Sequence, residues 1–452
     1  MCGAQLIDAV AGFYKISRWS DPASRNIMNI INKNVVTHKD VTCPFCSLLC
    51  DDLVIKNQAG RLKVPGNGCS MAKTRFEQTQ PTVKPAVNGK EVTLDDAINH
   101  TIKIFRHARQ PLIAGLGTDV AGMRAVMQLA DKTGAIIDHM HSDGAMRNIK
   151  VMQDHGWMMT TLAEIKNRAD LVIFAGTDGI TNYPRFYERV IWNENSLFNI
   201  NIKQREIIYI GDGLNTSAGK SPSGRQPTTV NCRQEQIAEV IATLHALIVG
   251  NEIQEQQVAG IKLGVLEKLA KRMQQARYGV IVWAPGELNH QHAELTIQAI
   301  SQAIKYLNRT TRFAGLSLAG NDGGMTAINV SAWQSGYPLR VNFSKGYPEY
   351  DPYKYAVKNL LNKKEVDTLM WISSFNANIN PPKAKIPTIV LATPLLKLHF
   401  KPEVFIPVGT PGLDHRGQLF RTDSVVALPL KHVRNTDYSS TAEILNRIAQ
   451  AL

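Results

Sequence analysis

The sequence contains few cysteines and no long apolar run. Only six of its 452 residues are cysteine, which excludes the disulfide-dense scaffolds that stabilise small secreted proteins. No apolar stretch reaches the roughly 20 residues that a transmembrane helix needs. Hydrophobic residues make up 44% of the chain and charged residues 20%, which is typical of a globular protein. We therefore expect no membrane insertion.

Basic residues are in excess, but they are scattered. The chain has 51 Lys and Arg against 38 Asp and Glu, a formal net charge of +13, which predicts anionic partners such as acidic subunits or polyanionic cofactors. No basic run of the kind that binds nucleic acid is present, since the basic segment at 431–434 is short. The pattern predicts no nucleic-acid binding.

Residues 1–40 are predicted to form an N-terminal tail without chemistry of its own. The apolar segment 9–14 has no basic region before it and is too short for the core of a signal peptide. Met28 opens a segment that runs directly into the first cysteines, so a start at either Met1 or Met28 is left open. No export is implied, and the expected location is the cytoplasm.

Four of the six cysteines form one motif. Cys43, Cys46, Cys50 and Cys69 follow the pattern Cys-x2-Cys-x3-Cys-x18-Cys, which is typical of the ligands of a single [4Fe–4S] cluster, because a cubane needs four converging thiolates. A structural zinc ion also takes four thiolates, but zinc ribbons usually present two Cys-x2-Cys pairs and this chain has one. The motif predicts an iron–sulfur domain, with zinc as the alternative.

Apolar runs that end in glycine alternate with amphipathic segments along the rest of the chain, a pattern that predicts parallel sheets buried on both faces. A capping pattern starts helices at Thr93, Thr161 and Ser440, and one long helical region is expected over 234–276. We predict strands at 112–117, 135–138, 170–176, 206–212, 278–284, 313–318, 368–372, 388–391 and 403–407.

The predicted fold is α/β, with a small N-terminal iron–sulfur domain followed by two doubly wound parallel-sheet domains. The glycines near 115–122 miss the G-x-G-x-x-G spacing of dinucleotide-binding folds, so NAD binding is not expected. The expected parts are a tail (1–40), the [4Fe–4S] domain (41–80), a first α/β domain (81–225), a second α/β domain (226–430) and a C-terminal helix (431–452).

A cluster domain before two α/β domains resembles the molybdopterin oxidoreductases related to formate dehydrogenase. Several segments are similar to the B subunit of formylmethanofuran dehydrogenase, in the same order from about residue 40 to 430. They are Cys-Pro-Phe-Cys-Ser-Leu-Leu-Cys-Asp-Asp (43–52), Thr-Leu-Ala-Glu-Ile-Lys-Asn-Arg-Ala-Asp-Leu-Val-Ile-Phe-Ala-Gly-Thr (161–177), Tyr-Pro-Arg-Phe (183–186), Trp-Gln-Ser-Gly-Tyr-Pro (333–338) and Gly-Thr-Pro-Gly-Leu-Asp-His (409–415).

The resemblance implies a role in a multisubunit complex of one-carbon metabolism. In that family, a tungsten or molybdenum bis-pterin guanine dinucleotide reduces carbon dioxide to formate, and a metal-dependent amidohydrolase subunit handles the formyl group. A bacterial branch, the formyltransferase/hydrolase complex, releases formate, and its B-like subunit has lost the redox chemistry. The expected partners are the other subunits of such a complex.

The resemblance also locates the residue that should hold the metal. Redox-active members place a Cys or selenocysteine about six residues after the aspartate that ends the second strand; here Asp143 or Gly144 stands there, and no cysteine lies between Cys69 and Cys232. We therefore predict a scaffold subunit without its own metal redox site. A working oxidoreductase, with Asp143 or His141 in place of the thiolate, is the alternative, and His139 is a further candidate active-site residue, unless the histidines are hydrogen-bonded loop residues.

The resemblance implies further cofactor contacts. The loops that contain Gly323 and Gly324, and Gly409 and Gly412, could cradle pterin phosphates with backbone N–H groups, or they could be simple turns. Lys73, four residues after Cys69, stands where the superfamily commonly has a lysine between cluster and pterin, although it could equally be a solvated lysine at the start of a helix.

Overall fold

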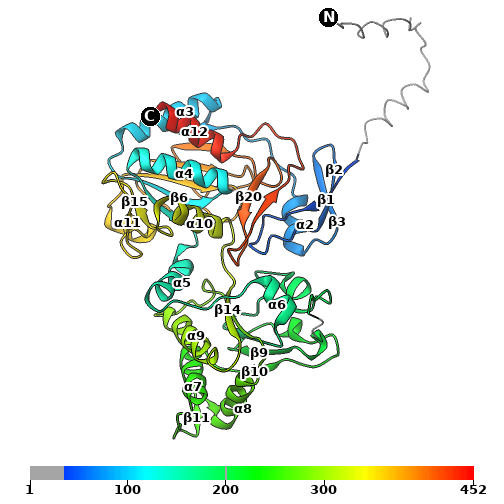
Figure 1. The fold of residues 1–452 in the computed structure, drawn as a ribbon. Helices are drawn as coiled ribbons and strands as arrows, with labels where there is room; N and C mark the ends of the chain where they lie inside the picture. The colour runs from blue at the N-terminus through cyan, green and yellow to red at the C-terminus, as the bar shows by residue number, and fades with distance from the viewer. Residues whose placement is uncertain (1–34, 199–200) are drawn as a thin grey trace, which may run out of the picture.

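The computed structural model describes residues 35–198 and 201–452. Most of the predicted tail, including Met28, lies outside the described residues. The described chain forms an upper and a lower lobe, with a small cysteine-bearing module beside them (Figure 1). No helix in this part of the chain is long and apolar enough to cross a membrane.

The upper lobe contains a nine-stranded sheet whose five central strands are parallel and whose edge strands are antiparallel. The predicted strands of this sheet are confirmed. Its order is β16 (Glu349–Tyr350), β15 (Val341–Asn342), β7 (Ile136–His139), β6 (Pro111–Gly117), β17 (Thr368–Ser373), β18 (Thr388–Ala392), β19 (Val404–Pro407), β4 (Ala86–Val87) and β5 (Lys90–Glu91).

Helices cover both faces of this sheet, because alternate residues of its buried strands point to opposite sides. Ile113 of β6 belongs to the core beneath most of the helices, whereas Leu112 and Ala114 face the core beneath α11. The helices of this lobe are α3 (Leu94–His107), α4 (Val120–Thr133), α10 (Gly324–Ser335), α11 (Val357–Lys363) and α12 (Thr441–Ala451).

The lower lobe contains a parallel five-stranded sheet. Its order is β10 (Thr228–Val230), β9 (Glu206–Ile210), β8 (Leu171–Ala175), β13 (Gly279–Trp283) and β14 (Phe313–Ser317). One face packs against helices α7 (Ile237–Val249), α8 (Leu263–Gln274) and α9 (Glu294–Leu307). The other elements of this lobe are α5 (Ser142–His155), α6 (Leu162–Arg168), the π-helix η1 (Tyr187–Ile191), the 3-10 turns η2 (Ile202–Gln204), η3 (Ser217–Gly219) and η4 (Gln234–Gln236), and strands β11 (Gln257–Val258) and β12 (Ile261–Lys262).

The cysteine module consists of the antiparallel strands β1 (Val35–Val41), β2 (Leu53–Gln58) and β3 (Arg61–Gly66) with helix α2 (Ser70–Glu77). Its interior is continuous with one face of the five-stranded sheet, where Phe45 and Phe76 share a core with Phe174. A hairpin of β20 (Gly417–Phe420) and β21 (Ala427–Leu430) joins it to the upper lobe through Leu49 and Leu419. The module therefore contacts both lobes.

The two sheets do not divide at residue 225 as the sequence predicts. The five-stranded sheet runs from β8 to β14, so residue 225 falls inside it, and the nine-stranded sheet takes strands from before and after that whole segment. The lower lobe is thus an insertion between β7 and β15. The cysteine module also begins at Val35 rather than at residue 41, and the final helix at Thr441 rather than at 431. Hydrophobic periodicity finds strands but does not say which of them pair.

The predicted helix starts are confirmed by their caps. The side chains of Thr93, Thr161 and Ser440 each accept a hydrogen bond from the backbone N–H three residues on. The last helix, α12, buries Ile444 and Ile448 in the upper core, so the C-terminus docks on this lobe. The predicted helical region 234–276 is interrupted instead, because Gly250 ends α7 in a left-handed conformation with φ of 95°.

Candidate functional site

The four motif cysteines lie on one loop and at one helix start. The backbone N–H of Cys43 donates to the carbonyl of Cys50 at 2.8 Å, and Leu49 N–H donates to the carbonyl of Cys46 at 3.1 Å, which closes the loop into a compact turn. Cys69 is the N-cap of α2, and its Sγ accepts a hydrogen bond from Ala72 N–H at 3.4 Å. The first three cysteines are buried and Cys69 is half-buried.

Burial and mutual repulsion keep these thiols neutral when no cation is present. Burial, together with the neighbouring cysteines, raises the pKa of Cys46 to about 12. It raises the pKa of Cys50 to about 11, against the opposing charges of Arg185 and Arg189, and that of Cys43 well above its usual value. A coordinating metal deprotonates such thiols outright. Three buried thiols and the half-buried Cys69, with arginines beside them, therefore fit a thiolate-bound metal cluster.

No group of three or more His, Cys, Asp or Glu side chains within residues 35–198 and 201–452 is placed to hold a single metal ion. This statement covers the four cysteines, whose thiols interact electrostatically without meeting at one point.

The cysteine loop is fastened to the chain on several sides. Ser47 N–H donates to Asn321 Oδ1 at 2.9 Å, and Ser47 Oγ donates to the Ala319 carbonyl at 2.6 Å. Thr422 N–H donates to the Ser47 carbonyl at 2.8 Å. The buried Arg185 donates to both carboxylate oxygens of Asp52, from Nη1 to Oδ1 at 2.6 Å and from Nη2 to Oδ2 at 2.8 Å. The loop therefore joins segments that lie more than 250 residues apart in sequence.

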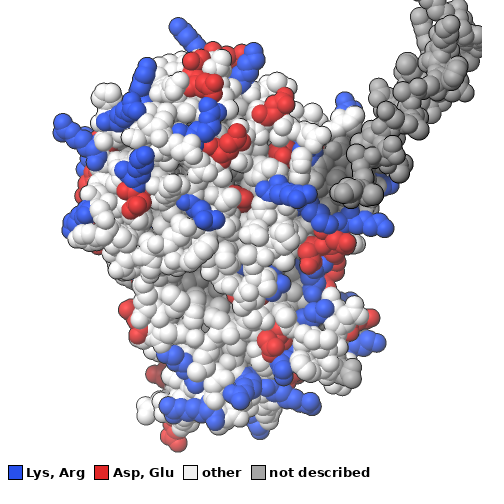
Figure 2. Space-filling view, turned by 45° about the horizontal axis from the view of Figure 1, so that its top comes forward, with Lys and Arg blue, Asp and Glu red and all other residues white. Residues whose placement is uncertain are grey.

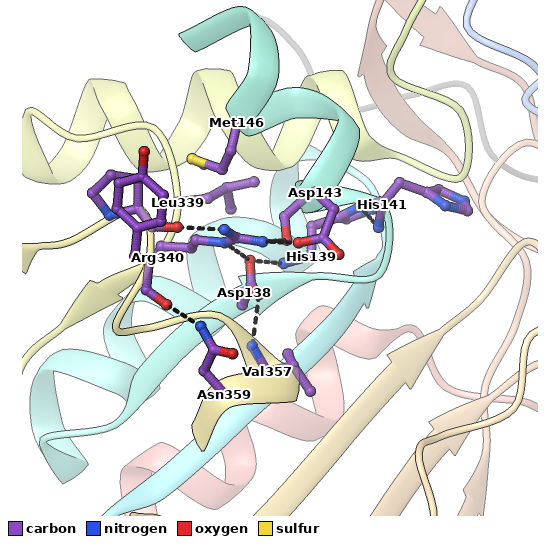
Figure 3. A network of polar contacts seen from close by, with 12 residues as sticks. Asp138, His139, His141, Asp143, Met146, Leu339, Arg340, Val357 and Asn359 are labelled. Carbon is purple, nitrogen blue, oxygen red and sulfur yellow. Dashed lines mark hydrogen bonds and ion pairs between the residues drawn. The ribbon is translucent and has the colours of Figure 1, made fainter. Parts of the chain in front are cut away.

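The second candidate site lies at the carboxyl end of β7, where open α/β sheets usually bind ligands. Figure 3 shows Arg340 between Asp138 and Asp143. The buried guanidinium lies with Nε 3.5 Å from Asp138 Oδ1, and its Nη2 bonds both Ser142 Oγ, at 3.0 Å, and the Asp143 carboxylate. Burial raises the pKa of Asp138, although Arg340 opposes that shift. Asp143 is thus neutralised by Arg340, while its side chain is 76% exposed.

Gly144, the other residue at the expected thiolate position, lies against the backbone of the neighbouring loop. A Cβ at this position would stand 3.0 Å from Gly286 Cα and 3.1 Å from its nitrogen. A cysteine side chain at Gly144 would therefore require the backbone to shift.

The two histidines lie side by side with defined partners. His141 N–H donates to His139 Nδ1 at 3.0 Å, so the proton of His139 must be on Nε2, which lies 3.2 Å from the carbonyl of Asp322. Burial, followed by the nearby His141, lowers the pKa of His139 to about 3. His139 is therefore a neutral, fully hydrogen-bonded residue at ordinary pH.

His141 forms a pair with Asp322, a residue that the sequence did not single out. His141 Nε2 lies 2.9 Å from Asp322 Oδ2, and Asn376 Nδ2 donates to both oxygens of this buried carboxylate at 3.2 Å. Burial opposes ionisation, but the bond from His141 and the charge of Arg75, 3.7 Å away, hold the pKa of Asp322 below its usual value.

Arg75 rather than Lys73 lies between the cysteines and this site. Lys73 is exposed. The Arg75 guanidinium stacks over the Phe45 ring at 5.4 Å; its charge opposes the rise in the pKa of Cys46 and helps to hold the pKa of Asp322 below its usual value. The only sequence signal for Arg75 was its position on the helix that Cys69 caps.

The glycines predicted to cradle phosphates are packed against protein instead. A Cβ on Gly323 would stand 2.6 Å from the Thr118 carbonyl, and one on Gly324 3.1 Å from the ring of His139. A Cβ on Gly412 would stand 3.3 Å from Pro44 Cγ, and one on Gly409 would stand 3.1 Å from Asp414 Cβ.

In the loop that contains Gly409 and Gly412, a backbone N–H group already donates to a carboxylate of the protein. Thr410 N–H donates to Asp414 Oδ2 at 2.8 Å, and Asp414 in turn pairs with the buried Arg434 at 2.8 Å. Close packing therefore accounts for these glycines without a ligand.

Curated relatives cover nearly the whole chain. It is 27% identical over 405 residues to the B subunit of the tungsten-containing formylmethanofuran dehydrogenase 2 of Methanocaldococcus jannaschii, covering 86% of this chain and 92% of the relative. It is 28% identical to the Fhc B subunit of the formyltransferase/hydrolase complex of Methylorubrum extorquens, covering 74% of this chain and 87% of the relative. The chain is a homologue of these B subunits. The resemblance predicted from the sequence is confirmed.

The fold agrees with this relationship. A chain in the crystal structure of the Methylorubrum extorquens formyltransferase/hydrolase complex with methylofuran superposes on this one with a TM-score of 0.67. The match covers 81% of this chain and 98% of the other at 24% sequence identity, and it supports the α/β architecture. No family model matches the chain.

Proposed function

We propose that the chain is the B subunit of a formyltransferase/hydrolase-type complex in one-carbon metabolism. In this proposal it is a scaffold: its small N-terminal domain binds a [4Fe–4S] cluster through Cys43, Cys46, Cys50 and Cys69, and its formate dehydrogenase-like lobes no longer carry a redox-active metal. Its partners are the other subunits, including a metal-dependent amidohydrolase, and its location is the cytoplasm.

The observation that carries the proposal is that the residues at the end of β7 already contact other parts of the protein. Asp143 is held by Arg340, and a side chain at Gly144 would require the backbone of Gly286 to shift. A catalytic metal centre keeps an open coordination position and a ligand free to bind it. Here the carboxylate at the thiolate position already has a cationic partner, which weighs against Asp143 as a replacement ligand.

The alternative, a working tungsten or molybdenum oxidoreductase, also lacks support from the glycine loops. A pterin guanine dinucleotide would need backbone N–H groups that face open space. Gly323, Gly324, Gly409 and Gly412 instead make close contacts with the protein's own backbone and side chains.

For the cysteines, the motif favours the cluster over zinc. Zinc ribbons usually present two Cys-x2-Cys pairs, and this chain has one. A cubane holds each of four thiolates on a different iron, and three closely spaced cysteines with a distant fourth can supply them.

Activity assays on the intact complex test this function. The complex is purified without oxygen, and two reactions are measured: formate oxidation with a viologen dye, and release of formate from the formylated furan cofactor. We expect no dye reduction, and we expect release of formate that is lost when this chain is omitted. Formate-dependent dye reduction would overturn the scaffold role.

A further inference from the structure

One face of the upper lobe exposes an unusual group of aromatic side chains. Four of the exposed large hydrophobic residues fall within 333–353, with exposed fractions of 66% for Trp333, 38% for Tyr337, 55% for Tyr347 and 61% for Tyr353. Tyr337 also stacks on Tyr350 with ring centroids 5.4 Å apart. We call these five residues the aromatic face: Trp333, Tyr337, Tyr347, Tyr350 and Tyr353, which lie between the end of α10 and the segment after β16. Aromatic side chains of this kind are enriched where proteins bind proteins.

A groove of about 780 Å³ continues this face across the helices of the upper lobe. Trp333 and Phe343 form one side, and Arg124 and Gln128 of α4 form the other, with Asn446 of α12 at the end. Nothing in the described chain fills it. The groove is large enough to accept several side chains of another polypeptide.

Three cations lie at the aromatic face, two of them on its exposed rings and the third, Lys354, on the buried ring of Tyr355. The Arg124 guanidinium lies 5.9 Å from the Trp333 ring centroid, Lys150 Nζ lies 3.7 Å from that of Tyr353, and Lys354 Nζ lies 5.2 Å from that of Tyr355. None of these three cations forms an ion pair with a carboxylate of the described residues. Figure 2 shows Lys and Arg interspersed with Asp and Glu over the visible surface.

A similar stacked pair in the lower lobe differs in this respect. Arg168 lies 4.1 Å from the ring centroid of Phe198, which is also exposed, but Arg168 is held by Glu164 at 2.6 Å. Its charge is therefore satisfied within the chain. The aromatic face instead combines apolar anchors with cations that form no direct ion pair, although Asp131 also lines the groove and Glu349 lies within electrostatic reach of Lys354.

We infer that the aromatic face docks an acidic, apolar segment of another subunit of the complex. Carboxylates of that segment would pair with Arg124, Lys150 and Lys354, and its apolar side chains would fill the groove beside Trp333. Electrostatic complementarity of this kind favours encounter with the correct partner, and Trp, Tyr and Arg are the residues that most often dominate interface energy. The inference rests on the proposed function, since it takes the partner from the same complex.

Dilution of the purified complex tests the inference. Full-length chains carrying Trp333→Ala, or Arg124→Glu with Lys150→Glu, are each co-expressed with the remaining subunits, and dissociation is followed by mass photometry. Phe198→Ala and Arg168→Glu are the matched controls, because they remove a similar stacked pair from the lower lobe. Circular dichroism confirms that each variant chain folds.

We expect Kd to rise about tenfold or more for Trp333→Ala and for the double charge reversal, and to stay within about twofold for the controls. The wild-type complex, but not the charge-reversed one, should also weaken as salt is raised. Unchanged affinity in both aromatic-face variants would overturn the inference and leave the proposed function standing. A wild-type chain that joins none of the subunits would overturn both. Self-association of the wild-type chain, abolished by Trp333→Ala, would overturn the acidic partner in favour of a second copy.

Discussion

The cysteine loop and the end of β7 have opposite characters. The loop presents three buried thiols beside the half-buried Cys69, and hydrogen bonds of Ser47 and Arg185 connect it to both lobes. At the end of β7, by contrast, Asp143 is paired with Arg340, and Asp322 is paired with His141. One site has thiols that could become ligands of a metal cluster, and the other has paired its own charges.

Under the proposed function, this difference teaches that two parts of one site are kept for different reasons. A cluster at the cysteine loop would contribute to folding even without electron transfer, because binding free energy of the metal becomes folding free energy. A terminal metal site without its ligand would make no such contribution, and its space can be closed by ion pairs.

The largest effect is expected from Cys46→Ser. Loss of one of four ligands should release the cluster and leave the cysteine loop without its centre, so that the lobes separate more easily. Iron per chain should fall close to zero, and the subunits should dissociate during size-exclusion chromatography. Cys232→Ser is the matched control, since Cys232 is buried in the core of the lower lobe. An intact, iron-free complex would contradict a structural role for the cluster.

Arg185→Ala should destabilise the chain by about 3 kcal/mol. Arg185 is buried and bonds both Asp52 and Glu188, so its removal takes away charge-assisted hydrogen bonds and buried packing, while the partly exposed Asp52 keeps Arg189 as a second partner. Denaturant titration measures the change in the free energy of unfolding. Lys63→Ala, which breaks the exposed pair with Glu77, should cost less than about 1 kcal/mol; equal losses in the two variants would argue against the fastening role of Arg185.

Substitutions at Asp138 and Asp143 should differ in size. Asp138→Asn leaves the buried Arg340 with only the exposed carboxylate, so we expect a loss of roughly 3 kcal/mol. Asp143→Asn removes a partner that is 76% exposed and should cost about 1 kcal/mol or less. Thermal unfolding compares the two. If Asp143 held a catalytic metal, its substitution would instead remove that metal from the complex.

His139 should make stability depend on pH. Its pKa is about 3 in the folded chain and about 6.5 when unfolded, so the unfolded state binds the extra proton. Stability is therefore fully present above pH 6.5 and is lost as pH falls toward 3, by about 1.4 kcal/mol per pH unit. From pH 7.5 to 5.0 the wild type should lose about 2 kcal/mol more than His139→Gln in denaturant titrations. Parallel losses in the two proteins would show that other groups control the acid sensitivity.

Short sequence patterns predicted the helix starts and the strands of this molecule, but they did not predict which distant segments contact one another. The caps at Thr93, Thr161 and Ser440 and the buried parallel strands follow from short segments, and the structure confirms them. The insertion of the lower lobe between β7 and β15 could not be predicted, because apolar runs do not encode their neighbours.

The same limit applies to the candidate site. His139 and His141 were found from their place after a strand, whereas Asp322 and Asn376 come from segments about 180 and 235 residues away. The glycines at 323, 324, 409 and 412 were predicted to cradle phosphates or to form simple turns, and in the structure the groups nearest to them belong to the protein. A glycine in the sequence marks a position where another group can lie close to the backbone, and only the fold shows whether that group is a ligand or part of the protein.

The metal content of the complex tests the central claim most directly. The complex is purified without oxygen, and iron, zinc, tungsten and molybdenum are measured per copy of this chain by mass spectrometry, with correction for metals bound by the other subunits. The account predicts about four iron atoms per chain and neither tungsten nor molybdenum. Tungsten or molybdenum near one equivalent would contradict the scaffold role, and zinc in place of iron would contradict the cluster.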